Sequence, residues 1–266
     1  MVDLGEPLAA GRTADIYRWG EAKVVKLYQP WMSLEAVESE RRKTSAAQTL
    51  GISVPAVGDI VHVKDRVGLV FERIDGPSMM DLLTLHQDAV PSSARQLAEL
   101  QATFHAAGSP LELPDQSETL ANRISDSELL SPEMRARALE ALARMPVEGK
   151  LCHGDFHPGN IMLSDRGPVI IDWIDATRGH PMADIARTSL LFLGHLETSD
   201  EADAAKSAIE LFHKAYLAWH LVQDPTRRDQ YQSWFPIVAA ARLAEGIAEQ
   251  EDWLLVQVHV GLGGES

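Results

Sequence analysis

The run Leu151-Cys-His-Gly-Asp-Phe-His-Pro-Gly-Asn160 constrains this chain more than any other part of its sequence. It places a carboxylate at Asp155 and a carboxamide at Asn160. Two short apolar segments, residues 161–164 and 168–172, follow it around the turn sequence Asp-Arg-Gly and predict a tight hairpin. The second segment ends in another carboxylate, Asp172. Such a hairpin can bring Asn160 and Asp172 to one side of the fold.

The spacing of Asp155 and Asn160 is that of the protein-kinase catalytic loop, H-R-D-x-x-x-x-N. In that loop the aspartate accepts the proton of the attacking hydroxyl, and the asparagine binds magnesium. Asp172 ends an apolar run, as the aspartate of a kinase D-F-G segment does. Magnesium prefers carboxylate and amide oxygens. The pattern therefore predicts phosphoryl transfer from a nucleotide, with Asp155 as the base and Asn160 and Asp172 as metal ligands.

The composition excludes several other classes of protein. The 266 residues are 45% hydrophobic and 24% charged, which is typical of a globular chain with one large or two modest domains. No apolar stretch reaches the roughly 20 residues needed to span a bilayer, and the N-terminus lacks the pattern of a signal peptide. The single cysteine, Cys152, suits a reducing compartment. We therefore expect a cytoplasmic protein with no membrane partner.

The charge balance bears on possible partners. The formal net charge is −15, from 24 Lys and Arg against 39 Asp and Glu. Nucleic acids are bound through clusters of Lys and Arg, so this excess of acid argues against a nucleic-acid partner. An acidic surface also favours the approach of a cationic small molecule. Solubility is the simpler explanation of the charge, and we prefer it.

The first third of the chain has the pattern of a small antiparallel sheet with one helix. Ser33 can cap a helix over residues 33–50, since Gly51 follows as a stop signal. Apolar, β-branched and aromatic residues bounded by turn signals predict the strands. These strands are expected over residues 14–19, 23–28, 57–63 and 67–74.

Beyond Gly76-Pro77 the pattern becomes helical. Leu97, Leu100 and Phe104 recur at the spacing of a buried helix face. Helices are expected over residues 79–85, 92–107, 118–130 and 132–144, and again from Asp184 onward with a break at Asp224-Pro225. The sequence thus predicts an α+β protein in two lobes. Residues 1–75 would form a nucleotide-binding lobe, and residues 76–266 a larger, mostly helical lobe with the catalytic loop and the acceptor site.

The N-terminal segment contains candidate nucleotide contacts. Lys26 lies in Val24-Val-Lys-Leu-Tyr28, where a kinase lysine would pair with the α- and β-phosphates. A helical glutamate should hold this lysine, and we choose Glu40 over Glu35 and Glu38.

Two further segments of the N-terminal lobe are predicted to contact the nucleotide. The loop over residues 10–17 would cover the phosphates. It has a single glycine, Gly11, so we expect contacts from backbone amides and from Thr13. The strand ending in Phe71-Glu-Arg-Ile-Asp75 would present backbone groups to the adenine edge, at Glu72 and Ile74.

Taken together, these residues resemble the aminoglycoside phosphotransferase family, the choline-kinase branch of the protein-kinase-like fold. The run H-G-D-x-H-x-x-N and the later I-D-W are specific to that family, and the resemblance covers nearly the whole chain. It implies a bilobal protein-kinase-like fold. It also implies that Asp155 is the catalytic base, that Asn160 and Asp172 bind Mg²⁺, and that Lys26 with Glu40 contacts the phosphates.

The resemblance assigns supporting roles to other residues. Asp184 matches an acidic residue that braces the catalytic loop from the next helix, and the family usually has an aspartate where His180 stands. His153 is interpreted as a packing residue under the loop. Asp175 could face the acceptor or serve only in a turn.

We therefore expect a small-molecule kinase. With Mg²⁺, it would transfer the γ-phosphate of ATP or GTP to a hydroxyl of a small acceptor, such as a cationic aminoglycoside-like antibiotic or a metabolite. One alternative is a nucleotide-binding module of the same fold without transferase activity. A second is a metal-dependent hydrolase that uses His153, Asp155 and His157. A protein kinase is disfavoured because no Ala-Pro-Glu segment follows Asp172. Either a monomer or a homodimer is compatible with the sequence.

Overall fold

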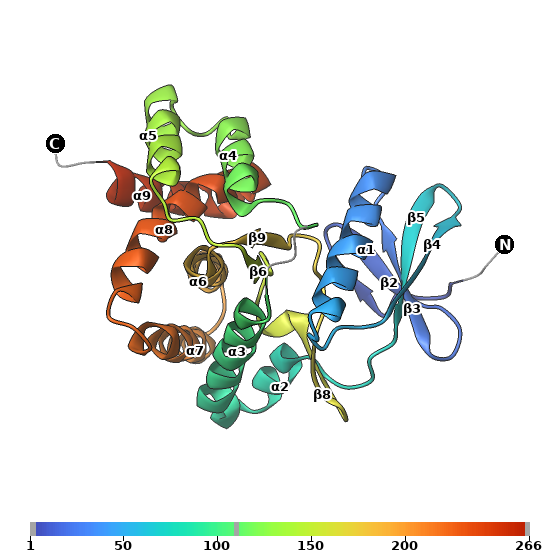
Figure 1. Ribbon diagram of the computed structural model, residues 1–266. Helices are drawn as coiled ribbons and strands as arrows, with labels where there is room; N and C mark the ends of the chain where they lie inside the picture. Colours follow the sequence, from blue (N-terminus) through green and yellow to red (C-terminus); the bar gives the residue numbers. More distant parts are fainter. Residues whose placement is uncertain (1–3, 109–111, 264–266) are drawn as a thin grey trace. The chain divides into compact units, whose positions relative to one another are not determined.

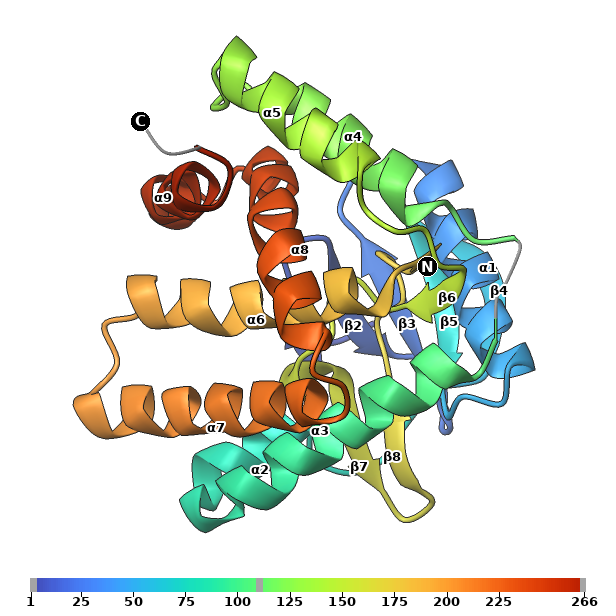
Figure 2. The same ribbon diagram turned by 60° about the vertical axis from the view of Figure 1, so that its left-hand side comes forward.

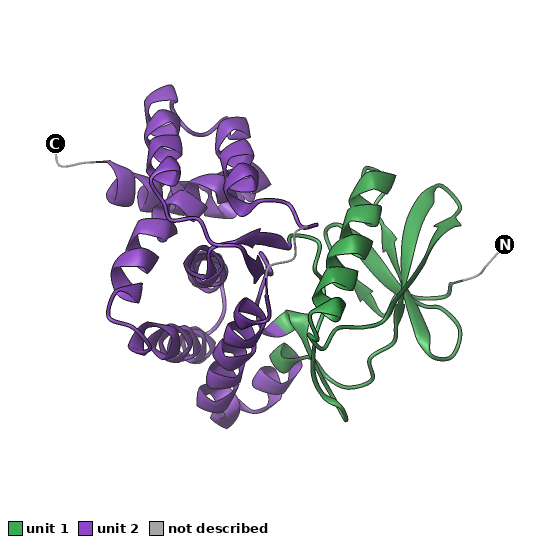
Figure 3. Ribbon diagram, viewed as in Figure 1, with its two compact units in different colours: residues 1–80, 159–175 green, residues 81–158, 176–266 purple. Residues whose placement is uncertain are grey.

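Figure 1 shows the computed structural model, which describes residues 4–108 and 112–263. The chain divides into two compact units (Figure 3). The first unit comprises residues 1–80 and 159–175, and the second comprises residues 81–158 and 176–266. Residues 159–175 thus pack with the N-terminal part of the chain, although the sequence had placed them with the C-terminal lobe. The first stretch ends five residues after the expected lobe boundary at residue 75.

The first unit is built on a five-stranded antiparallel sheet with the strand order β1-β2-β3-β5-β4. In its centre, Lys26 pairs with Ile16 on one neighbouring strand and with Leu69 on the other. The strands are β1 (Ala9–Ala10), β2 (Ala14–Arg18), β3 (Lys23–Tyr28), β4 (Val57–Val63) and β5 (Arg66–Glu72). Among the described residues, α1 (Leu34–Thr49) is the one α-helix that lies entirely in this unit. The predicted sheet with one helix is confirmed.

Helix α1 begins and ends where its sequence signals predict. The Ser33 hydroxyl accepts a hydrogen bond from the backbone N–H of Ala36 at 3.2 Å, which satisfies a donor of the first turn. At the other end, Gly51 adopts a φ of 80°, a left-handed conformation that glycine tolerates without strain. The buried Val37 of α1 packs in one cluster with Tyr28 and Leu69 of the sheet.

A hairpin from the middle of the chain completes the first unit. Strands β7 (Ile161–Ser164) and β8 (Gly167–Ile170) pair in antiparallel register, with Ile161 opposite Ile170. The backbone N–H of Leu163 donates to the carbonyl of Pro77 at 2.8 Å. Gly76 makes this approach possible, because a Cβ there would lie 2.0 Å from the Leu163 carbonyl oxygen. The glycine is required for close packing at the position where the sequence predicted a boundary.

The second unit is mostly helical (Figure 2). Its helices are α2 (Met79–Leu85, beginning at the unit boundary), α3 (Val90–Ala106), α4 (Gln116–Asp126), α5 (Pro132–Ala143), α6 (Pro181–Thr198), α7 (Asp203–Val222), α8 (Arg227–Arg242) and α9 (Glu251–Leu262). Helix α6 packs against both α7 and α8 and is buried over most of its length. Two short strands, β6 (Lys150–Cys152) and β9 (Thr177–Gly179), pair beside it. No helix within the described residues is long and apolar enough to cross a membrane.

Two histidines of α7 are buried without hydrogen bonds at Nε2. His213 is 8% exposed and His220 is 1% exposed. Within the described part of the chain, neither Nε2 atom has a hydrogen-bond partner. Burial disfavours the charged imidazolium, which lowers the pKa of His213 to about 4 and that of His220 to about 3. Both side chains are therefore neutral in the folded protein at pH 7.

These two histidines predict how stability depends on pH. Their pKa values are depressed in the folded state, so between about pH 6.5 and pH 4 the unfolded chain binds protons that the folded chain does not. The free energy of unfolding should therefore fall by about 2 to 4 kcal/mol from pH 7.5 to pH 5. Urea denaturation at each pH measures this slope. A His213→Phe/His220→Phe variant should lose most of it, whereas a change at the exposed His259, His259→Gln, should keep it. An unchanged slope in the double variant would contradict the assignment.

Candidate active site

In the first unit, Lys26 and Glu40 form a buried ion pair. The Lys26 Nζ lies 2.8 Å from Oε1 and 3.1 Å from Oε2 of Glu40. The Tyr28 hydroxyl also donates to Glu40, at 2.6 Å. Lys26 is 7% exposed and Glu40 is 1% exposed. Of the three acidic candidates on α1, the structure places Glu40 at this lysine, while Glu38 faces Arg42 on the helix surface.

Asp172 is a second partner of the same lysine. Its Oδ1 lies 2.7 Å from the Lys26 Nζ. Burial alone acts to lower the pKa of Lys26, but the charges of Glu40 and Asp172 outweigh it and hold that pKa above its ordinary value. Lys26 is therefore a fixed ammonium ion. Asp172 adopts a φ of 62°, a left-handed conformation that aspartate tolerates better than most residues.

The β7–β8 hairpin brings Asn160 next to the segment that carries Asp172. The backbone N–H of Ile171 donates to the carbonyl of Asn160 at 3.0 Å, directly before Asp172. Asn160 itself is 7% exposed. A carboxamide and a carboxylate thus lie at adjacent backbone positions, and their oxygens are the donor type that magnesium prefers. The residues fit a magnesium ion by their chemistry.

In the second unit, His153 supports the loop that carries Asp155. This side chain is fully buried and packs against Phe104 and Phe156, with ring centroids 6.4 Å and 5.6 Å away. Its Nδ1 accepts a hydrogen bond from the backbone N–H of Asp155 at 3.2 Å. The imidazole therefore contacts the loop through packing and through a hydrogen bond with its backbone.

Asp184 of α6 holds the next part of the loop. Its Oδ1 accepts a hydrogen bond from the backbone N–H of Gly154 at 2.8 Å. Its Oδ2 lies 3.0 Å from the Gln101 Nε2 and 2.9 Å from the His105 Nε2. Burial acts to raise the pKa of Asp184, but the contacts with His105 and Gly154 outweigh it, so the net pKa is lowered. The charged, buried Asp184 thus holds the loop backbone in place at Gly154.

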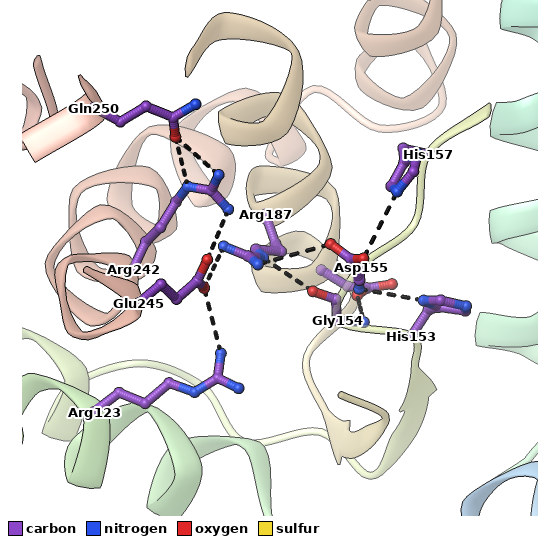
Figure 4. Close-up of polar contacts among 10 residues, drawn as sticks. Arg123, His153, Gly154, Asp155, His157, Arg187, Arg242, Glu245 and Gln250 are labelled. Atoms are coloured by element: carbon purple, nitrogen blue, oxygen red, sulfur yellow. Dashed lines mark hydrogen bonds and ion pairs between the residues drawn. The ribbon is translucent and has the colours of Figure 1, made fainter. Parts of the chain in front are cut away.

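Asp155 lies among cationic and polar groups (Figure 4). The Arg187 Nη2 is 3.8 Å from its Oδ1, and the His157 Nε2 is 3.7 Å from its Oδ2. Burial acts to raise the pKa of Asp155, but His157 and Arg187 outweigh this effect and hold the pKa well below its usual range. The carboxylate is therefore ionised at neutral pH. Sequence reasoning missed Arg187, whose only signal is its place one helical turn after Asp184.

The sequence matches the phosphotransferase enzyme family over residues 5–231. The chain belongs to this family. It is accordingly a phosphotransferase, and the resemblance predicted from its motifs is confirmed. A comparison with curated protein sequences finds no match.

Several solved structures have a fold similar to that of this phosphotransferase. The apo form of a thermostable mutant of aminoglycoside phosphotransferase APH(4)-Ia has a TM-score of 0.66 at 16% identity, covering 98% of this chain and 95% of that one. Amicoumacin kinase in complex with AMP-PNP, Ca²⁺ and its ligand has a TM-score of 0.59 at 11% identity, covering 96% and 87%. Aminoglycoside phosphotransferase APH(3'')-Id from Streptomyces rimosus, with ADP and streptomycin, has a TM-score of 0.53 at 20% identity, covering 89% and 91%. These matches confirm the predicted protein-kinase-like fold.

The remaining predicted nucleotide contacts of this phosphotransferase lie at or just beyond the ends of strands of the first unit. The backbone N–H of Gly11 donates to the Ala14 carbonyl at 2.9 Å and closes the turn that contains Thr13. Glu72 is engaged by its neighbours, because its N–H donates to the Ala56 carbonyl at 2.8 Å and its carboxylate accepts from the Ala56 N–H at 3.0 Å. Ile74 is half-buried beyond the end of β5.

Two further positions discussed from the sequence precede α6 along the chain, one in each unit. Asp175 is half-buried and is the last residue of the segment 159–175, which belongs to the first unit. His180 is the N-cap of α6, and its Nδ1 accepts a hydrogen bond from the backbone N–H of Met182 at 3.1 Å. The imidazole thus performs the capping that an aspartate would perform at this position.

The hydrolase alternative does not fit this geometry. His153 is fully buried and its Nδ1 is bonded to the loop backbone. Among the described residues, the one group of three His, Cys, Asp or Glu side chains close enough to share an ion is His105, Cys152 and Asp184, which contains neither His153 nor His157.

The buried ion pair predicts a specific loss of stability. Glu40→Gln keeps the shape of the side chain but leaves the Lys26 ammonium with a neutral partner, so we expect the free energy of unfolding to fall by about 2 kcal/mol. Urea denaturation measures this change. Glu38→Gln on the exposed face of the same helix is the matched control and should change stability by no more than about 0.5 kcal/mol. Equal effects of the two substitutions would contradict a buried, charged pair.

Proposed function

We propose that this phosphotransferase transfers the γ-phosphate of ATP to a hydroxyl group of a small-molecule acceptor, with Asp155 as the general base. The observation that carries the proposal is the ion pair between Lys26 and Glu40, together with Asp172 at 2.7 Å from the same lysine. In protein kinases, the corresponding pair and the corresponding aspartate must both be in place for phosphoryl transfer.

The first unit supplies the nucleotide side of the reaction. The Lys26 ammonium would bind the α- and β-phosphates, and Glu40 would keep it in position. Asn160 and Asp172 would hold a magnesium ion, which supplies neutralisation of the phosphate charge when it is bound. Several of the solved structures of similar fold contain ADP, ATP or AMP-PNP, and one of them contains Ca²⁺, which supports ATP as the donor and a divalent cation as its companion. Use of ATP also supports a cytoplasmic location.

Asp155 acts on the hydroxyl group of the acceptor. In the transfer step, the hydroxyl oxygen forms a bond to the γ-phosphorus, the bond from that phosphorus to the bridging oxygen breaks, and ADP leaves. The hydroxyl proton passes to the Asp155 carboxylate. His157 and Arg187 hold the pKa of Asp155 low, so it is a weak base that orients the hydroxyl first. It takes the proton late, as fits a loose transition state.

The acceptor is proposed as a hydroxylated, aminoglycoside-like antibiotic or a metabolite of similar character. Of the proteins of similar fold, one has been solved with hygromycin B, another with streptomycin, and a third is an amicoumacin kinase. The net charge of −15 is compatible with a cationic acceptor.

Substitution of Asp155 tests this function. Turnover of ATP and of GTP with Mg²⁺ is measured across a panel of hydroxylated amines, antibiotics and sugars. Asp155→Asn should lower acceptor-dependent turnover by about 10²- to 10⁴-fold, while thermal stabilisation by Mg·ATP should persist. Asp165→Asn, at the exposed hairpin turn, is the control and should leave turnover unchanged.

The outcomes separate the proposal from its alternatives. A fully active Asp155→Asn variant would show that the base is misassigned. Stabilisation by Mg·ATP without turnover on any acceptor of the panel would favour a nucleotide-binding module of the same fold. If the protein shows no turnover and is also not stabilised by Mg·ATP, the kinase function is contradicted.

A further inference from the structure

We propose that Arg187 is a positioning residue for Asp155 and that Glu245 sets how closely Arg187 approaches it. The inference rests on the proposed role of Asp155 as the base. It concerns a connected set of charged side chains in the second unit that runs from the catalytic loop to the segment after α8 (Figure 4).

Arg187 contacts two consecutive residues of the loop. Its Nε donates a hydrogen bond to the carbonyl of Gly154 at 2.9 Å. Its Nη2 lies 3.8 Å from Oδ1 of Asp155, which is within ion-pair range but beyond hydrogen-bond length. The Arg187 side chain is 9% exposed and therefore has little freedom to move. The guanidinium thus fixes the loop backbone and supports the Asp155 charge without donating a hydrogen bond to that oxygen.

Glu245 binds the opposite side of the same guanidinium. Its Oε1 lies 2.7 Å from the Arg187 Nη1. This contact is 1.1 Å shorter than the one to Asp155, by subtraction of 2.7 Å from 3.8 Å. The Arg187 guanidinium therefore lies closer to the Glu245 carboxylate than to the Asp155 carboxylate.

Glu245 is itself held in place. It ends the short 3₁₀ helix Leu243–Glu245, and Gly246 follows with a φ of 60°. The Arg242 Nη1 donates to its Oε2 at 3.2 Å, and the Arg123 Nη1 lies 3.7 Å from its Oε1. Arg242 is 5% exposed and also donates from Nη2 to the Gln250 Oε1 at 2.9 Å. The position of Glu245 is thus determined by α8 and by the turn that precedes α9.

The charges give this arrangement a consequence for catalysis. Three guanidinium groups, of Arg123, Arg187 and Arg242, share the carboxylates of Glu245 and Asp155. If Glu245 loses its charge, Arg187 is attracted more strongly to Asp155. A shorter Arg187–Asp155 contact would place a charge-assisted hydrogen bond on Oδ1 of the proposed base, and an oxygen that already accepts such a bond takes up a proton less readily. Glu245 therefore holds Arg187 at ion-pair distance from Asp155 rather than at hydrogen-bond distance.

Glu245→Gln tests this inference, because it removes the charge and keeps the shape. We expect kcat to fall by about 10- to 100-fold, with the KM values for ATP and for the acceptor unchanged. Glu245→Asp keeps the charge and should restore part of kcat. Glu140→Gln, which breaks an exposed pair between Glu140 of α5 and Arg144 just after that helix, is the matched control and should keep wild-type kcat and KM. Thermal unfolding with and without Mg·ATP shows whether each variant is folded.

A double substitution distinguishes positioning from a loss of structure. If Glu245 acts through Asp155, then Glu245→Gln should not lower the residual rate further in an Asp155→Asn background. A further fall of the same size would mean that Glu245 supports the fold generally and would overturn the proposal. Wild-type kcat in folded Glu245→Gln would also overturn it, while the loss of turnover in Asp155→Asn would leave the proposed function intact.

Discussion

Moving a carboxylate out of water costs several kcal/mol unless cations and hydrogen-bond donors are brought to it, and this cost organises both units of the chain. In the first unit, the buried Glu40 is satisfied by Lys26 and Tyr28. In the second, the buried Asp184 is satisfied by the backbone of Gly154 and by side chains of α3. Each carboxylate gathers residues that are distant in sequence. The unit can therefore not fold completely without also assembling part of its candidate site.

Backbone pairing decides where these charges meet. Lys26 lies on β3 between β2 and β5, so its position is fixed by two neighbouring strands. The β7–β8 hairpin binds to the same unit through backbone hydrogen bonds at Pro77 and Ser53. Because the hairpin packs here, Asp172 lies next to Lys26. Asp172 has a left-handed φ, a conformation that is unfavourable for most residues other than glycine. The ion pair at 2.7 Å offsets that local strain.

The sequence predicted those parts of the fold and of the candidate site that local patterns identify. The strand with Lys26, the capped helix with Glu40 and the loop of Asp155 were all recognisable, because spacing and capping signals identify them. The expected helix over residues 118–130 ends earlier, as α4 at Asp126. Strands β6 and β9 were not predicted, since three-residue strands that pair across the chain have no periodicity to detect. Glu245 was missed for a similar reason, because an ion pair between distant segments leaves no local signature.

The two carboxylates of the candidate site, Asp172 and Asp155, lie in different electrostatic surroundings. Asp172 contacts Lys26 at hydrogen-bond distance, which suits a group that must stay fixed beside phosphates. A nitrogen of Arg187 lies 3.8 Å and a nitrogen of His157 lies 3.7 Å from the carboxylate oxygens of Asp155, and both side chains act to lower the pKa of Asp155. A general base must be ionised and must still be able to bind the hydroxyl proton. Support at a longer distance satisfies both requirements, and the unequal sharing of Arg187 with Glu245 is the physical means by which that distance is kept.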